Sequence, residues 1–490
     1  MNGERLLLVL DAGTSSTRAL LYTVEGATVA NASEVVTQHY PHPGWVEHDA
    51  AEIWEHSLAC LRDVVAAVGT ARISCLGLTN QRETIVFWDA ASGEPLAPAI
   101  VWQDRRTADA CGRLRDAGHE PAVQATTGLL LDPYFSGTKI AWALANWPAV
   151  KAAADAGSLR LGTVDAYLRY RLTEGRVHAT DATNASRTLL MNLASCTWDD
   201  AMIDLLGVPR AALPTITDCA GDLGTTTLLG GEIKITGSAG DQHAAAIGQA
   251  CLSPGQVKAT YGTGCFVLAN AGAVTPVSTH RLLATLAWRL GGVATYALEG
   301  SIFTAGAAVQ WLRDGLGIIG DSAETERLAK SVPDSGGVVF VPALAGMGAP
   351  HWRPDVRGLL TGLSRGTTRA HVARAALEAM GHQTADLLSA LASDGVVPER
   401  LRVDGGMVAN DWLCQDLADT TGLVVERPRV IETTALGAAM LAGVGAGLFA
   451  SLDEASAMRQ TDRVFEPAIS ADDRAARRHR WANAIKQALA

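Results

Sequence analysis

The chain of 490 residues lacks any apolar run that approaches the roughly 20 residues of a membrane-spanning helix. Met1 to Leu10 also lacks the long apolar segment and cleavage site of a signal peptide, so it is interpreted as the first strand of the fold. The eight cysteines are scattered, without a C-x-x-C pair or metal-ligand spacing. A net charge of −11 supplies no obvious basic face for nucleic acid or an anionic membrane. These absences predict a cytoplasmic protein that neither inserts into membranes nor binds nucleic acid.

A Walker-type phosphate loop is also missing, because no glycine is followed directly by lysine and then by serine or threonine. The motif G-x-G-x-x-G occurs at Gly315 to Gly320, but it follows the helical-looking segment Ala305 to Leu312 instead of a strand. We interpret it as a plain loop. An anionic substrate such as ATP must therefore be bound by other backbone donors and a metal.

The length and composition favour two α/β domains. Single cores stop growing at about 250 to 300 residues, so 490 residues are too many for one. Strands alternate with segments of helical pattern such as Thr368 to Leu391 and Thr433 to Leu448, which is typical of the α/β class. The pattern is interrupted at Ser253-Pro254-Gly255. We expect one domain over residues 1–250 and a second over 251–490.

Three glycine-containing turns follow apolar strands. Two of them join a pair of strands, and the backbone N–H groups of such turns can bind an anion, although the alternative is a plain β-turn. Because one strand–turn–strand unit lies in each half of the chain, we expect a duplicated fold. The first unit is Leu6–Leu10, Asp11–Arg18 and Ala19–Tyr22, the second is Val257–Ala259, Thr260–Phe266 and Val267–Ala269, and the third turn, Asp404-Gly405-Gly406, follows Leu401–Val403.

Two aspartates have both a structural and a functional interpretation. Asp11 ends the first strand, where it could stabilise its own turn or lie near a metal. Asp241 follows the strand Ile233–Thr236 and opens a helix over Gln242–Ala250. It could cap that helix, or it could accept a proton from a hydroxyl or hold Mg²⁺ through water. The local sequence does not decide between these roles.

Arg82 and Glu83 lie in a polar run directly after the apolar strand that contains Cys75 to Leu78. A surface ion pair is the simplest interpretation. Neighbouring side chains of an extended chain point to opposite sides, however, so these two are poorly placed to pair with each other. Each needs another partner, and a small polyol could satisfy both.

Several longer segments resemble the FGGY carbohydrate kinase family, and the resemblance extends over nearly the whole chain. Within the family they are most similar to members that act on glycerol. The segments are Gly44–Asp49, Asn80–Thr84, Ile100–Thr107, Asp132–Lys139, Thr183–Thr188, Gly240–Gln242, Thr260–Phe266, Gly358–Leu363 and His371–Glu378.

This resemblance implies a two-domain actin-like (ribonuclease H-like) ATPase fold with the active site in the interdomain cleft. It also implies ATP- and Mg²⁺-dependent phosphorylation of glycerol, with Asp241 as general base and with Asp11 and Asp241 near the metal. The implied polyol site consists of Arg82, Glu83, Trp102, Tyr134, Asp241, Gln242 and Phe266. The implied ATP site consists of Thr14, Ser15, Ser16, Arg18, Thr263, Gly306, Gln310, Gly406 and Asn410.

The chain departs from the family's pattern at Ala12, Ser15 and His243, where glutamine, threonine and a second glutamine are usual. His243 could alter the polyol affinity or the pH response, but we expect it to face the surface of its helix. The loop 228–233 is shorter than in members inhibited by a sugar bisphosphate, which puts such control in doubt. Another kinase of this family and an actin-like ATPase without a polyol substrate stay open as alternatives, as does a homo-oligomer.

Overall fold

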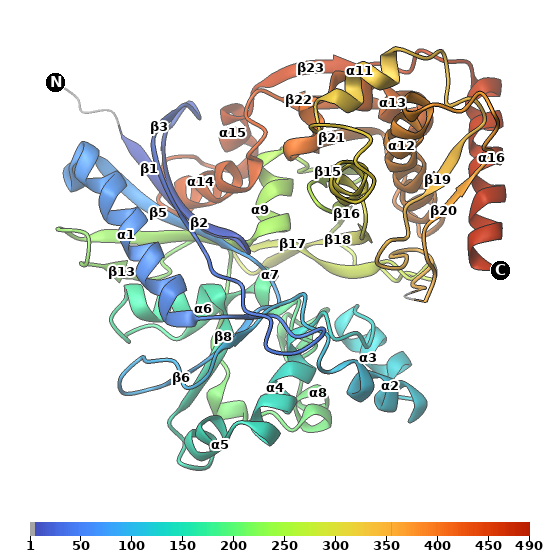
Figure 1. Ribbon diagram of the computed structural model, residues 1–490. Helices are drawn as coiled ribbons and strands as arrows, with labels where there is room; N and C mark the ends of the chain where they lie inside the picture. Colours follow the sequence, from blue (N-terminus) through green and yellow to red (C-terminus); the bar gives the residue numbers. More distant parts are fainter. Residues whose placement is uncertain (1–4, 354) are drawn as a thin grey trace.

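The computed structural model describes residues 5–353 and 355–490, and Figure 1 shows two α/β halves built on two large sheets. The first sheet has six strands in the order β13-β14-β5-β1-β2-β3. The second has seven strands in the order β17-β18-β16-β15-β21-β22-β23. In chain order, the strands of the first sheet are β1 (Leu6–Ala12), β2 (Ser16–Thr23), β3 (Thr28–Val35), β5 (Ile73–Asn80), β13 (Thr225–Thr226) and β14 (Ile233–Gly240), and those of the second are β15 (Gln256–Tyr261), β16 (Cys265–Gly272), β17 (Leu283–Leu290), β18 (Val293–Ile302), β21 (Arg400–Asp404), β22 (Val424–Pro428) and β23 (Thr461–Phe465).

The two sheets share one pairing pattern, which confirms the expected duplication. In the first sheet, β1 lies at the centre between β2, which is antiparallel to it, and β5, which is parallel to it. Farther out, β3 pairs antiparallel with β2, and β14 pairs parallel with β5. In the second, β15, β16, β18, β21 and β22 repeat this arrangement strand for strand. Each unit is followed by a helix, α9 (Asp241–Gly248) after β14 and α14 (Thr433–Gly445) after β22. The chain thus contains the same sheet twice.

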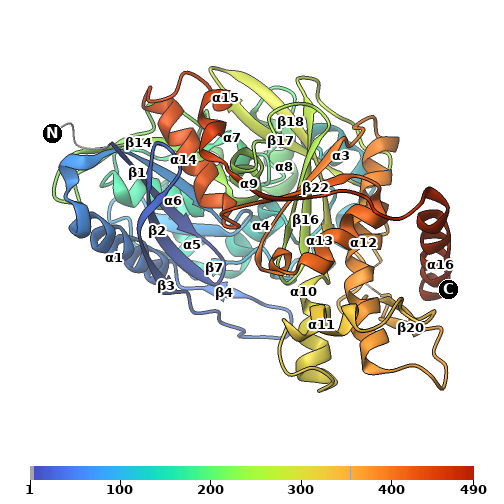
Figure 2. The ribbon, with the colours of Figure 1, turned by 90° about the horizontal axis from the view of Figure 1, so that it is seen from above.

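The alternation of side chains along β1 explains how its continuous apolar run is buried on both faces. Leu6, Leu8 and Leu10 pack with helices α1 (Ala50–Val68) and α6 (Val164–Leu172). Leu7 and Val9 point to the opposite face and pack with α9 and α14. Figure 2 shows α9 and α14 close together beside the first sheet, although α14 belongs to the far end of the chain. The two halves therefore share a helical layer.

Helices α12 (Arg369–Ser393) and α13 (Asp411–Thr421) pack against the second sheet and complete its core. The predicted helices 368–391 and 433–448 are confirmed as α12 and α14, with ends shifted by up to three residues. All eight cysteines are buried and unpaired, as ordinary core thiols. In the described part of the chain, no helix is long and apolar enough to cross a membrane.

The remaining elements belong to both halves. They are β4 (Glu47–His48), β6 (Ile85–Asp89), β7 (Ala99–Ile100), β8 (Leu159–Thr163), β9 (Ala179–Asp181), β10 (Met191–Asn192), β11 (Thr197–Trp198), β12 (Thr215–Thr217), β19 (Val339–Val341), β20 (Leu359–Thr361), α2 (Ala108–Asp116), α3 (Glu120–Thr127), α4 (Ser136–Asn146), α5 (Pro148–Asp155), α7 (Ala182–Ala185), α8 (Asp200–Leu206), α10 (Gly306–Gln310), α11 (Glu324–Lys330), α15 (Leu452–Ala455) and α16 (Ala471–Leu489).

Candidate active site

The first glycine turn places a buried carboxylate beside an arginine. Asp11 and Arg18 are opposite each other on β1 and β2, and Arg18 Nη2 donates to Asp11 Oδ2 at 2.7 Å. Arg18 Nη1 also donates to Glu432 Oε2, at 2.9 Å, just before α14. Asp11 thus contacts a side chain across its own hairpin, while the turn itself is closed by a hydrogen bond from Gly13 N–H to Ser16 O. Burial raises the pKa of Asp11, and Arg18 opposes that rise.

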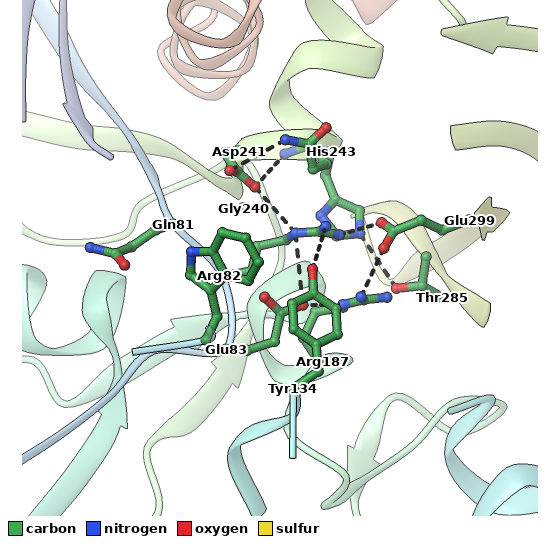
Figure 3. A network of polar contacts seen from close by, with 12 residues as sticks. Gln81, Arg82, Glu83, Tyr134, Arg187, Gly240, Asp241, His243, Thr285 and Glu299 are labelled. Atoms are coloured by element: carbon green, nitrogen blue, oxygen red, sulfur yellow. Dashed lines mark hydrogen bonds and ion pairs between the residues drawn. The ribbon is translucent and has the colours of Figure 1, made fainter. Parts of the chain in front are cut away.

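The polar run after β5 forms the centre of a charged cluster, shown in Figure 3. Arg82 Nη1 donates to Glu299 Oε2 at 2.5 Å, while its contact with Glu83 is long, 3.9 Å. Glu83 instead accepts from Arg187 Nε at 2.6 Å, and Arg187 Nη2 reaches Glu299 Oε1 at 2.9 Å. The prediction that Arg82 and Glu83 need separate partners is confirmed, but these partners are protein side chains.

Arg187 and Glu299 are the members of this cluster that sequence reasoning missed. Glu299 lies on β18, in a stretch that is buried from Tyr296 to Ile302. A single acidic residue in such an apolar strand is the signal that could have revealed it, since unpaired charges are almost never buried. Arg187 lies in one of the segments on which the family resemblance rests, but without an assigned role. Burial acts to raise the pKa of Glu299, but the two guanidinium groups outweigh it and lower the pKa to about 2.

Asp241 lies next to Arg82 and is not a helix cap. The helix α9 begins at Asp241 with Gly240 as its N-cap, and Asp241 Oδ1 accepts from the N–H of the neighbouring Gln242 at 2.7 Å. The capping interpretation is therefore wrong. Arg82 Nε lies 3.2 Å from Asp241 Oδ1, and 31% of the Asp241 side chain is exposed while that of Arg82 is buried. The carboxylate is thus held by a buried cation and stays open to an incoming group.

Three aromatic residues from separate segments meet beside this pair. The ring of Trp102 lies 5.6 Å from that of Tyr134 and 6.1 Å from that of Phe266. All three are half-buried, and the Tyr134 hydroxyl lies 3.4 Å from Arg82 Nη2. Trp102 Nε1 donates to Thr14 Oγ1 at 2.9 Å, which joins this aromatic wall to the first glycine turn. The structure therefore brings together the residues expected around the polyol.

Gln242 is held by a buried lysine. Lys258 Nζ donates to Gln242 Oε1 and, at 2.8 Å, to Thr260 Oγ1. With its oxygen engaged, the Gln242 amide directs Nε2 toward Asp241 Oδ2, 3.4 Å away. Lys258 is fully buried, and burial lowers its pKa while the charge of Asp404 opposes that effect. Asp241 and Gln242 therefore form one hydrogen-bonded unit with Lys258 of β15.

The second and third glycine turns lie against each other. Thr263 O in the second turn accepts from Ala305 N–H and Ala307 N–H at the start of α10, and Gly306 N–H donates to Gly262 O. A Cβ on Gly306 would press against that same carbonyl, 2.5 Å away. Gly405, in the third turn, approaches the backbone of Tyr261 with a φ of 87°. Here glycine permits close packing of backbone on backbone.

The expected ATP residues near these turns differ in their surroundings. A Cβ on Gly406 would meet no atom within 4 Å, so the space beside this residue is free. Asn410 caps α13 by accepting from Leu413 N–H at 3.0 Å. Gln310 and Thr263 are exposed, as is Ser15. The third turn leads into a short 3₁₀ helix, Gly406–Ala409, and so differs from the two hairpin turns.

His243 is fully buried, and the expectation that it faces the helix surface is wrong. Its Nε2 lies 3.4 Å from Thr285 Oγ1, and its Nδ1 has no hydrogen-bond partner among the described residues. Burial lowers its pKa well below 6.5, and the nearby charges of Arg82 and Arg187 lower it further. The ring is therefore neutral at neutral pH, and it lies beside the charged cluster (Figure 3).

Family models match this chain in two parts. The N-terminal domain of the FGGY family of carbohydrate kinases matches residues 6–248 and its C-terminal domain matches 257–446. The curated glycerol kinase of Rhodospirillum rubrum is 54% identical over 98% of both chains, and glycerol kinase 1 of Pseudomonas aeruginosa is 50% identical over 98% of both. The chain belongs to the FGGY family.

Solved structures of FGGY kinases share the fold. The crystal structure of Plasmodium falciparum glycerol kinase with ADP has a TM-score of 0.94 at 34% identity and covers 99% of both chains. Xylulose kinase from Lactobacillus acidophilus has a TM-score of 0.90 at 22% identity over 98% of this chain and 97% of its own. The expected two-domain actin-like fold is thereby confirmed.

As in other enzymes that transfer phosphoryl groups, Mg²⁺ in an FGGY kinase would need oxygen ligands, and Mg²⁺ usually combines one or two carboxylates with phosphates and water. Asp11 and Asp241 fit this chemistry. Their carboxylates are close enough to repel each other, since the charge of Asp241 contributes to the raised pKa of Asp11. A cation near both would offset that repulsion. In the described part of the chain no three His, Cys, Asp or Glu residues cluster as a metal site. The other ligands of an Mg²⁺ ion near Asp11 and Asp241 would be phosphate and water oxygens.

Proposed function

We propose that this FGGY kinase transfers the γ-phosphoryl group of ATP to a terminal hydroxyl of glycerol and so forms sn-glycerol 3-phosphate. The observation that carries this proposal is the Arg82–Asp241 contact beside the Tyr134 hydroxyl. It combines a buried cation, an open carboxylate and a phenol within one small region walled by Trp102 and Phe266. A triol offers hydroxyls for these groups and carbon for the aromatic rings.

In this proposal Asp241 accepts the proton of the attacking hydroxyl. A general base must lie within hydrogen-bond reach of that hydroxyl, and the exposed face of Asp241 meets this need. Arg82 and Glu83 bind the other hydroxyls with Tyr134, and Gln242, fixed by Lys258, donates its amide N–H to the same substrate. Phosphoryl transfer requires little covalent chemistry from the protein, so such positioning provides most of the rate enhancement.

ATP in this proposal lies along the three glycine turns. Thr14, Ser15, Ser16 and Arg18 on the first turn and Thr263 on the second face the phosphates, where backbone N–H groups can stabilise developing charge. The free space beside Gly406 supports the approach of the adenosine, with Gly306, Gln310 and Asn410 around it. Mg²⁺ near Asp11 and Asp241 would neutralise the phosphates. The division at residue 250 and the cytoplasmic location stay predictions.

The direct test is ADP release by the purified protein with glycerol, with xylulose and other polyols, and without any of them. Turnover that needs glycerol is expected. Turnover with a pentulose but not glycerol would favour another FGGY specificity. Turnover independent of any polyol would favour an actin-like ATPase.

Asp241→Asn tests the proposed base. Asparagine has nearly the same shape but cannot accept the proton, so kcat should fall by about 10² to 10⁴ while the melting temperature barely changes. Asp200→Asn is a matched control, because Asp200 is likewise the first residue of its helix, α8. An Asp241→Asn protein with near-normal kcat would remove Asp241 from the mechanism. Titration with Mg²⁺ in both variants separates loss of the base from loss of a metal ligand.

A further inference from the structure

Four buried side chains form a closed ring of charge under the proposed polyol site. Arg82 and Glu83 come from the segment after β5, Arg187 from the segment after α7, and Glu299 from β18 of the other sheet. Three close contacts, of 2.5 to 2.9 Å, join Arg82 to Glu299, Glu299 to Arg187 and Arg187 to Glu83, and the 3.9 Å approach of Arg82 and Glu83 completes the ring. Each side chain is at most 2% exposed.

This ring is balanced, with two positive and two negative groups. Glu299 uses one carboxylate oxygen for each arginine, so it fixes the two guanidinium groups relative to each other. Removing one member of a buried charge network leaves its partner charge uncompensated, which is far more costly than losing an exposed pair. The ring is therefore a rigid unit only while all four members are present.

Arg82 and Glu83, the members of the ring that face the proposed substrate, are held in their orientation by contacts with Glu299 and Arg187. Arg82 turns Nη1 toward Glu299, which leaves Nε facing Asp241 and Nη2 facing Tyr134. Among the described residues, Arg187 and Arg82 both approach the Glu83 carboxylate at Oε1, which leaves Oε2 for a hydroxyl. In Figure 3, Glu299 lies to the right of the Arg82 guanidinium and Arg187 lies below it, whereas Asp241 lies above it on the left.

We propose that Glu299 and Arg187 are positioning residues for the polyol: they hold Arg82 and Glu83 in the orientation that binds its hydroxyls. The inference rests on the proposed function, and it deepens that function by extending the polyol site to a strand of the second sheet. Neither residue need touch the substrate. Their effect is on affinity for the polyol, because the nucleotide turns lie on other segments.

The first test is Glu299→Gln, which keeps the shape of the side chain and removes its charge. The KM for glycerol should rise by about 10- to 100-fold, since hydrogen bonds from a charged group to the substrate are lost or misdirected. The KM for ATP should stay within about twofold and kcat should change much less than the glycerol KM. Equal changes in both KM values would overturn the proposal.

A matched control separates positioning from general loss of a buried ion pair. Asp416 on α13 is a buried carboxylate that accepts from Arg477 on α16, away from the proposed site. Asp416→Asn should lower the melting temperature and leave the KM for glycerol unchanged. A rise in the glycerol KM of this control comparable to that of Glu299→Gln would show that lost stability alone explains the effect.

The decisive variant is the double substitution Glu299→Gln with Arg187→Gln. It restores charge balance, because Arg82 and Glu83 are left as one pair, so it should recover stability lost in the single variant. Without the ring, however, the orientation of Arg82 is not fixed, and the glycerol KM should stay high. Recovery of both stability and KM would assign the ring a structural role only. Glycerol-dependent turnover by the wild type in the same assay tests the proposed function separately.

Discussion

At the scale of single residues, the partners of the buried polar groups are the feature that is hardest to predict from the sequence. Arg82, Glu83 and Asp241 could be predicted because they lie in short motifs directly after strands. Their partners could not, since Glu299 is 217 residues from Arg82 and Arg187 is 112 residues from Glu299. Pairing across such separations depends on the packing of the two sheets. No local pattern encodes it.

His243 gives a residue-scale prediction about pH. Its pKa is lowered well below 6.5 by burial, so the native imidazole is neutral from about pH 6 to 8. The pH profile of kcat/KM in that range should therefore be the same in wild type and in His243→Gln. An acidic limb present only in the wild type would show that the native ring titrates.

The stability of the same two proteins should respond to pH differently. The unfolded chain gains a proton on His243 as the pH falls through about 6.5, whereas the native state does not, so the wild type loses stability there. Melting temperatures between about pH 8 and 5.5 should fall more steeply for the wild type than for His243→Gln. Parallel curves would contradict the burial argument.

At the scale of elements, the strands and hairpins could be predicted from apolar runs and glycine residues. The packing of one helix against another could not. The alanine and glycine content of residues 433–448 predicts a helix that packs closely against a sheet, as α14 does, but it does not predict the contact with α9. Gly437 on α14 and Gly248 on α9 allow the two backbones to approach closely. A Cβ at Gly437 would lie 1.8 Å from Ala244 O, and one at Gly248 would lie 2.1 Å from Thr433 O, so either would overlap the other helix. Close approach of this kind needs glycine, and it fixes how the shared helical layer is assembled.

Gly437→Ala tests this packing. The added methyl would collide with Ala244 O, so the free energy of unfolding should fall by about 1–3 kcal/mol, as measured by denaturant titration. Gly112→Ala is a matched control: Gly112 lies inside α2, where a Cβ would meet no atom within 4 Å. That substitution should be neutral or slightly stabilising, given the helix propensity of alanine. Equal effects at both positions would show that the α9–α14 contact tolerates a side chain.

At the scale of the whole molecule, the two sheets are joined by charged contacts as well as by helices. Glu299 from the second sheet reaches the proposed polyol residues, and Glu432 before α14 reaches Arg18 on the first hairpin. The duplicated sheet could be predicted from the two strand–turn–strand units. Which side chains cross between the halves could not, since that depends on how the sheets are placed relative to each other.

The pair of Arg18 and Glu432 gives the last prediction. Arg18 is expected to bind ATP phosphates, yet here it contacts two carboxylates, Asp11 and Glu432. A phosphate must then compete with Glu432, whose side chain is 52% exposed. Exposed pairs contribute under about 1 kcal/mol, so Glu432→Gln should tighten ATP binding by up to about fivefold, with the glycerol KM unchanged.

Calorimetric titration of ATP at low and moderate salt checks this competition. The gain from Glu432→Gln should shrink as salt rises, because screening already weakens the exposed pair in the wild type. Asp355→Asn breaks a comparable exposed pair with Arg353 elsewhere on the surface and should leave ATP binding unaltered. Weaker ATP binding by Glu432→Gln would mean the opposite of competition: Glu432 would then hold Arg18 in the orientation that phosphate requires, as Glu299 is proposed to hold Arg82.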